Sequence, residues 1–130
     1  MKLLLDTHIL IWSAFEPRRL SPRVRRLLER SSTERWLSPI TSWEALLLVE
    51  SGRLRIDLAF DEWLLEMNSV LGLNEAPLTH EVVLASREVT IPHMDPADRL
   101  LAATARFYGL RLLTADERLL HGSGFSTLPN

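Results

Sequence analysis

The sequence contains no cysteine, which excludes disulfide bonds, zinc–thiolate sites and cysteine nucleophiles. Lysine is nearly absent too, because Lys2 is the only lysine among the 15 basic residues. A phosphoacceptor receiver domain needs a lysine near the carboxyl end of a late strand, so its absence there argues strongly against that class. Arginine suits two-pronged phosphate binding, although genome composition would explain the bias equally well.

Long apolar runs and glycine-rich loops are also missing. No run approaches the roughly 20 apolar residues of a membrane helix. The first apolar stretch, 3–5, meets Asp6 at once and is too short for a secretory signal. We therefore expect a soluble cytoplasmic protein without membrane association. The five glycines are scattered, so no loop is built to cradle nucleotide phosphates, and the histidines lack the spacing of zinc enzymes.

The bulk composition indicates one globular domain spanning residues 1–130. A hydrophobic content of 46% and a charged content of 25% are ordinary for folded proteins. The length is sufficient for a hydrophobic core that needs no disulfide bond or structural metal. The net charge of −2 neither favours nor excludes nucleic acid, because a local cluster of acids can mask a basic surface elsewhere.

Apolar segments typical of strands alternate along the chain with helical patterns. The expected strands are 3–5, 36–38, 75–78, 111–113 and 125–128. The expected helices are 8–13, 21–31, 41–50, 61–70, 80–88, 95–108 and 116–120, with Ser21 and Asp61 as N-caps and glycines after several helices. This alternation predicts an α/β fold with a parallel sheet, right-handed crossovers and helices on both faces.

Four acidic residues stand where an apolar stretch passes into a predicted helix: Asp6, Glu44, Asp98 and Asp116. In an open parallel sheet, ligands bind at the edge where strands lead into helices. Clustered carboxylates repel one another unless a divalent cation lies among them, and oxygen ligands suit Mg²⁺ or Mn²⁺. Such an ion can activate water and clamp a phosphate oxygen without any side-chain nucleophile. We therefore predict a metal-dependent phosphodiesterase, with RNA as the favoured substrate.

Each acid also has an ordinary structural interpretation. Thr41-x-x-Glu44 and Thr114-x-x-Glu117 match the helix capping box, and Asp95 before Pro96 is a typical N-cap. The alternative to an enzyme is thus a non-catalytic RNA- or protein-binding module whose acids only cap helices. Asparagine in place of Asp6 or Asp98 would separate the two hypotheses, since only an enzyme would lose RNA cleavage while keeping its fold.

Four motifs stand out in the sequence: Leu5-Asp6-Thr7-His8, Ser42-x-Glu44, His93-x-Asp95-Pro96-x-Asp98-Arg99 and Leu113-Thr114-x-Asp116. Together they resemble the PIN-domain ribonucleases, and within them the VapC-type toxins of toxin–antitoxin pairs. The resemblance covers essentially the whole chain, and the motifs are specific in combination. A haloacid-dehalogenase-like phosphatase fits less well, because it requires a second acid where His8 stands.

The resemblance implies a three-layer α/β/α sandwich around a five-stranded parallel sheet. It also implies a Mg²⁺- or Mn²⁺-dependent endoribonuclease, a cognate antitoxin protein and a homodimer. Carried over by position, Asp6, Glu44 and Asp98 match the family's three metal-site acids, and Asp116 matches its more variable fourth acid. Thr7, Asp95 and Thr114 are weaker candidates that would support these acids, with helix capping favoured for each.

Other residues beside the acids have open assignments. His8 and His93 could move protons, but a structural role is favoured, and Arg99 is expected to pair with an acid. An arginine run is equally consistent with an RNA-backbone surface and a solvated helix face; it comprises Arg18, Arg19, Arg23, Arg25, Arg26, Arg30 and Arg35. Most of the four tryptophans are expected in the core. The apolar run 46–49 cannot turn wholly inward from one helix, so part of it is expected to meet a partner.

Overall fold

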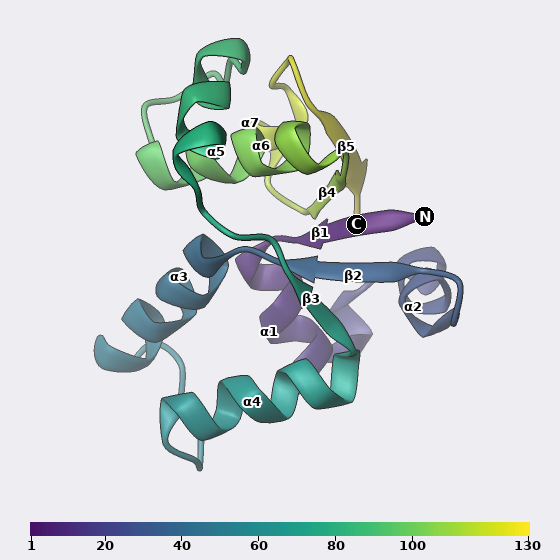
Figure 1. The fold of residues 1–130 in the computed structure, drawn as a ribbon. Helices are drawn as coiled ribbons and strands as arrows, with labels where there is room; N and C mark the ends of the chain where they lie inside the picture. The colour runs from purple at the N-terminus through teal and green to yellow at the C-terminus, as the bar shows by residue number, and fades with distance from the viewer.

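The computed structural model describes residues 1–130 as a three-layer α/β/α sandwich around one parallel sheet (Figure 1). The five strands are β1 (Lys2–Leu5), β2 (Glu34–Leu37), β3 (Leu73–Glu75), β4 (Arg111–Thr114) and β5 (Ser126–Pro129). Their order is β3-β2-β1-β4-β5, and every pairing is parallel. This confirms the predicted fold class.

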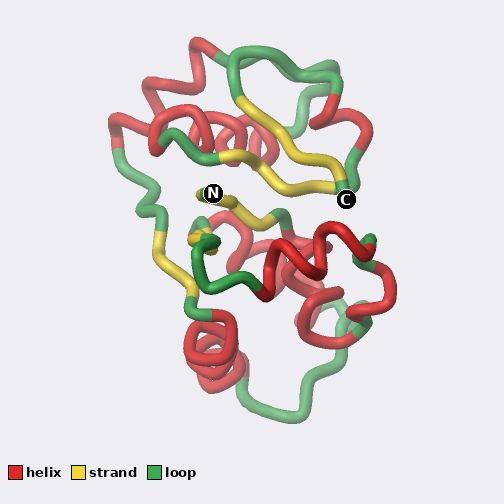
Figure 2. Tube along the Cα trace, turned by 90° about the vertical axis from the view of Figure 1, so that its right-hand side faces the viewer, coloured by secondary structure: helices red, strands yellow, loops and turns green.

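Seven α-helices and two short 3₁₀ helices connect the strands. They are α1 (Thr7–Phe15), η1 (Pro17–Arg19), α2 (Pro22–Glu29), α3 (Pro39–Glu50), α4 (Phe60–Leu71), α5 (His80–Ala85), η2 (Ser86–Glu88), α6 (Pro96–Tyr108) and α7 (Glu117–Leu120). The view turned by 90° shows helical segments on both sides of the strands (Figure 2). No helix combines the length and apolar character needed to cross a bilayer.

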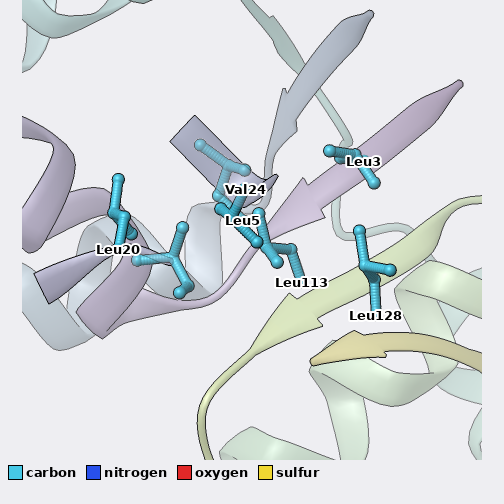
Figure 3. Close-up of a cluster of buried hydrophobic side chains, with 7 residues drawn as sticks. Leu3, Leu5, Leu20, Val24, Leu113 and Leu128 are labelled. Carbon is cyan, nitrogen blue, oxygen red and sulfur yellow. The ribbon is translucent and has the colours of Figure 1, made fainter. Parts of the chain in front are cut away.

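The central strand β1 is buried on both faces, which explains its unbroken leucine run. Leu3 and Leu5 point to one face and pack with Val24 of α2 and with Leu113 of β4 (Figure 3). Leu4 points to the opposite face, where its cluster includes residues of α6 and α7. This alternation is the period of two of an extended strand.

The order of the strands creates a crevice beside β1. The chain leaves β1 toward β2 and β3 on one side and returns to β4 and β5 on the other. Such a reversal of strand order is the point where open α/β sheets bind ligands. The residues that follow β1 and β4, among them Asp6 and Asp116, therefore stand at the mouth of this crevice.

Several predicted boundaries are wrong by a few residues, and local chemistry explains them. Helix α3 begins at Pro39, with Ser38 as its N-cap, because proline fits the first helical position. Thr41 is therefore inside the helix, where its hydroxyl donates to the Leu5 carbonyl at 3.3 Å. Helix α4 has Ala59 rather than Asp61 at its N-cap, and the predicted strand 75–78 lies earlier, at β3.

Candidate active site

The four predicted acids line one pocket of about 280 Å³ at the carboxyl edge of the sheet. They reach it from the first turns after β1 and β4, from α3 and from the start of α6. The other residues that line the pocket are Thr7, His8, Leu47, Leu48, Arg53, Asp95 and Arg118. We call this the acidic pocket. The structure thus brings together residues that lie up to 110 positions apart, Asp6 and Asp116.

Asp6 is buried at the floor of the acidic pocket, with both carboxylate oxygens held by threonines. It is the N-cap of α1, and its Oδ1 accepts the Thr7 backbone N–H at 2.8 Å. Its Oδ2 accepts the Thr114 hydroxyl at 2.6 Å. A carboxylate offers about four lone-pair positions, so acceptor capacity remains on both oxygens for a further ligand.

Glu44 reaches the same place from the middle of α3, and Thr7 links it to Asp6. The Thr7 hydroxyl donates to Glu44 Oε1 at 2.7 Å, while Oε2 accepts no hydrogen bond within the protein. The predicted capping box is wrong, because Ser38 caps this helix and Glu44 is its sixth residue. Helix capping therefore does not explain why an acid stands at this position.

Asp98, only 6% exposed, is held by His93 from the loop before α6. His93 Nε2 lies 2.7 Å from Asp98 Oδ2, while Asp98 Oδ1 accepts no hydrogen bond within the protein. Asp95 is the N-cap of α6, as predicted, since its Oδ1 accepts the backbone N–H groups of Ala97 and Asp98. A neighbouring hollow of about 390 Å³ is also lined by His93 and Asp95.

Asp116 is already paired with an arginine. It is the N-cap of α7, and Arg118 donates to both of its oxygens at 3.3 and 3.1 Å. Thr114 ties this acid to the first, because its hydroxyl accepts the Asp116 backbone N–H at 3.0 Å while donating to Asp6. The predicted capping box at Thr114 is wrong, because Thr114 ends β4 and Asp116 caps the helix.

The direction of the pKa shift separates three of the four acids from Asp116, which is paired with Arg118. Burial, followed by repulsion from neighbouring carboxylates, raises the pKa of Asp6, Glu44 and Asp98 above the ordinary values, although hydrogen bonds from threonine and His93 partly oppose this. Burial also acts to raise the pKa of Asp116, but the hydrogen bonds and charge of Arg118 outweigh it and hold that pKa low.

These donors fit a hard divalent cation. Three carboxylates in a small pocket destabilise one another when ionised and retain free oxygens, which is the chemistry that Mg²⁺ and Mn²⁺ satisfy. His93, Asp95 and Asp98 also form a compact group, with one potential ligand atom from each lying within 4.8 Å of the others. Asp98 therefore belongs both to this group and to the acidic pocket.

Two basic residues of the acidic pocket, Arg53 and Arg118, were not among the candidates from the sequence. The sequence Asp116-x-Arg118 at a helix start could have identified Arg118, because it places an arginine two residues after a predicted acid. No sequence pattern pointed to Arg53, which lies in the turns after α3. The expected ion pair of Arg99 is wrong, because its Nε donates to the Ser86 carbonyl. Arg35 does not belong to a free basic face, because backbone carbonyls, including that of Leu28, occupy its guanidinium.

Comparison with known proteins identifies the family. A model of the PIN domain matches residues 3–123, nearly the whole chain. The chain belongs to the PIN domain family. Ribonuclease VapC22 of Mycobacterium tuberculosis is 34% identical to this PIN domain over 119 residues, which cover 89% of this chain and 88% of the relative.

Solved structures share the fold of this PIN domain at low sequence identity. VapBC2 from Rickettsia felis, bound to a DNA fragment from its promoter, matches with a TM-score of 0.72 at 14% identity, covering 99% of this chain and 98% of that chain. FitAcB from Neisseria gonorrhoeae matches with a TM-score of 0.65 at 24% identity, covering 97% and 96%. These likenesses confirm the three-layer architecture.

Proposed function

We propose that this PIN domain is a metal-dependent endoribonuclease that acts as the toxin of a toxin–antitoxin pair. Asp6, Glu44 and Asp98 are its metal ligands, and Asp116 is the fourth acid of the catalytic site. Support comes from the acidic pocket itself, from membership of the PIN domain family and from the relative named as a ribonuclease.

Glu44 is the residue that carries the proposal. Asp6, Asp95 and Asp116 each cap a helix and would be explained without catalysis. Glu44 caps nothing, yet the Thr7 hydroxyl holds its carboxylate near Asp6, although burial and repulsion from neighbouring carboxylates raise the pKa of Glu44. An acid kept at an electrostatic cost and without a structural role favours the catalytic hypothesis over the non-catalytic module.

The side chains around the acidic pocket supply positioning and charge. When bound, Mg²⁺ or Mn²⁺ supplies Lewis-acid chemistry, which favours ionised water as nucleophile and offsets charge on a phosphoryl oxygen. Thr7 and Thr114 fix the carboxylates of Asp6 and Glu44, and His93 fixes that of Asp98. Arg53 and Arg118 place positive charge at the same pocket, where a phosphodiester would enter.

A protein partner is proposed from the exposed apolar surface beside the acidic pocket. Trp43 is 52% exposed and Leu47 is 42% exposed, both on α3, and Leu47 also lines the pocket. Exposed aromatic and leucine side chains at a site of this kind favour burial by another protein. We propose a cognate antitoxin as that partner and a homodimer as the assembly of the toxin itself.

Cleavage of RNA with and without divalent cation tests the proposal. The purified protein is incubated with total RNA in Mg²⁺, in Mn²⁺ and in EDTA, and fragments are resolved by electrophoresis. We expect cleavage with either cation and none in EDTA. Asp6→Asn and Glu44→Gln should each abolish cleavage while circular dichroism shows an intact fold.

Asp57→Asn is the matched control, because Asp57 is an exposed acid that does not line the acidic pocket. It should cleave RNA like the parent protein. Cleavage that survives both Asp6→Asn and Glu44→Gln, or that continues in EDTA, would contradict the assignment of the acids as metal ligands.

A further inference from the structure

A second charged hollow lies at the amino-terminal ends of β1 and β4, opposite the acidic pocket at the carboxyl ends of the strands. It has a volume of about 340 Å³ and no acidic residue lines it. Its walls are Met1, Leu27, Leu128 and four arginines, Arg23, Arg26, Arg30 and Arg111. We call it the basic pocket. In Figure 1, α2 lies beside the amino-terminal end of β1, whereas α3 and the start of α6 lie toward its carboxyl end.

Helix α2 and the residue that ends it bring three of these arginines together. Arg23 and Arg26 are three residues apart and so share one face of α2, and Arg30 is the C-cap that follows the helix and lines the same hollow. The inward face of the same helix buries Val24 against the sheet. Arg111 is added from the first residue of β4, which pairs with Leu3 of β1.

None of the four arginines of the basic pocket is neutralised within the protein. The ion pairs of the structure involve other residues: Arg19, His93, Arg106 and Arg118. Arg23 and Arg111 each donate to a backbone carbonyl, that of Pro129 at 3.2 Å and that of Thr127 at 3.0 Å. These bonds orient the guanidinium groups without cancelling their charge. The side chains of Arg26 and Arg30 make no hydrogen bond and remain available.

Four unpaired guanidinium groups around one hollow repel one another and favour an anion with several charges. Arginine matches phosphate oxygens through two parallel hydrogen bonds. The protein has a net charge of −2, so this concentration of positive charge is a local feature of one edge rather than a property of the whole surface.

We infer that the basic pocket binds backbone phosphates of the RNA substrate at a distance from the bond that is cut. The inference rests on the proposed function for the identity of the anion. Strand β1 separates the two sites, and at about 3.3 Å per residue the step from Met1 to Asp6 spans roughly 16 Å. An RNA strand must follow the protein surface around the sheet, so several nucleotides are needed to connect the two sites.

Contacts to phosphate do not distinguish one base from another. The basic pocket therefore contributes affinity and positions the RNA without selecting the sequence that is cut. Because these contacts are the same in the bound substrate and in the transition state, their loss raises KM and leaves kcat unchanged. An RNA with only two or three nucleotides on each side of the cut is too short to reach the basic pocket.

The test compares two arginine pairs by RNA binding in EDTA, where cleavage cannot interfere. Arg26→Gln/Arg30→Gln removes the two arginines without other partners. Arg55→Gln/Arg87→Gln removes the same charge from exposed residues that line neither pocket. Fluorescence anisotropy with a single-stranded RNA of about 20 nucleotides gives Kd across a range of salt concentrations.

The expected result is that Arg26→Gln/Arg30→Gln lowers the slope of log affinity against log salt by about 1.4, since each phosphate contact on a single strand contributes about 0.7. At 0.1 M salt this corresponds to about 25-fold weaker binding. The control pair should change little, and Arg26→Lys/Arg30→Lys should recover most of the slope. If the double variant folds poorly, Arg30→Gln alone should lower the slope by about 0.7.

Equal losses in the two pairs, no loss in either, or no RNA binding by the parent protein would overturn the inference. Cleavage assays separate this outcome from failure of the proposed function. With long RNA in Mg²⁺, the Arg26→Gln/Arg30→Gln variant should show a raised KM and an unchanged kcat, and with the short RNA it should match the parent. Absence of any cleavage alongside salt-dependent binding would refute the ribonuclease proposal and leave the basic pocket standing.

Discussion

Thr114 joins two of the proposed catalytic acids through a single buried hydroxyl, so removal of this hydroxyl tests how the site is held. The hydroxyl donates to Asp6 Oδ2 at 2.6 Å and accepts the Asp116 backbone N–H at 3.0 Å. Thr114→Val keeps the shape of the side chain and removes both interactions. Asp6 then loses one of the hydrogen bonds that oppose the rise in its pKa, so that pKa should rise further.

The magnitude follows from the two interactions that are lost. A hydrogen bond to a charged group contributes about 1.5–3 kcal/mol and a neutral one about 1 kcal/mol, so Thr114→Val should cost about 2–4 kcal/mol. For a chain of 130 residues this lowers Tm by about 10 °C. The Thr114 hydroxyl also orients the carboxylate of Asp6, a proposed metal ligand. Its loss should therefore lower the affinity for Mg²⁺ or Mn²⁺ about 10- to 100-fold.

Thr114→Ser is the matched control, because it keeps the hydroxyl and loses only a methyl group, at a cost of about 1 kcal/mol. Thermal unfolding followed by circular dichroism gives the stability of each variant, and calorimetric titration with Mn²⁺ gives the affinity. If the valine variant is no less stable than the serine variant, or binds Mn²⁺ equally well, the Thr114 hydroxyl does not hold the site.

Three further predictions concern the charges of the acidic pocket. In EDTA the free energy of unfolding should increase as pH falls from 7, because the raised pKa values of Asp6, Glu44 and Asp98 let the folded state keep protons that the unfolded chain has lost. This stabilisation is complete below the unfolded pKa values of 3.8 and 4.5 and disappears as pH rises through the folded values. Urea titrations in which Asp6→Asn shows the same pH dependence as the parent would count against it. Glu44→Gln should stabilise the cation-free protein at pH 7 while abolishing RNA cleavage, which paired melting and cleavage assays would check. Arg118→Ala frees the carboxylate of Asp116, so Mn²⁺ should bind more tightly in calorimetry; unchanged or weaker affinity would show that the arginine does not compete with the cation.

Much of the architecture was readable from local patterns. The unbroken run 3–5 indicated a buried strand, and Ser21 before Pro22 and the glycine after Tyr108 marked helix boundaries that the structure confirms. The errors fall where two local signals competed. Thr41 matched a capping box, but Ser38 before Pro39 provides the stronger start, and the threonine is drawn instead to a carbonyl of β1.

The candidate site was predicted as a set of residues rather than as a set of contacts. The sequence placed Asp6 and Asp116 directly after strands, and parallel strands bring such positions to one edge of the sheet. It could not predict that His93 lies against Asp98, or that the guanidinium of Arg35 donates to backbone carbonyls. Each of these depends on side-chain rotamers and on the packing of loops that no periodic pattern encodes.

The sequence by itself determined the succession of strands and helices along the chain and the helix starts at Asp6 and Asp95, because hydrophobic period and capping act over a few neighbouring residues. Only the tertiary structure decided which charges meet. Association of β1 with β4 lets Thr114 bond Asp6 across 108 positions and makes four carboxylates share one pocket. The same packing leaves the arginines of α2 unpaired at the far edge, because electrostatic energy depends on distance in space rather than on separation along the chain.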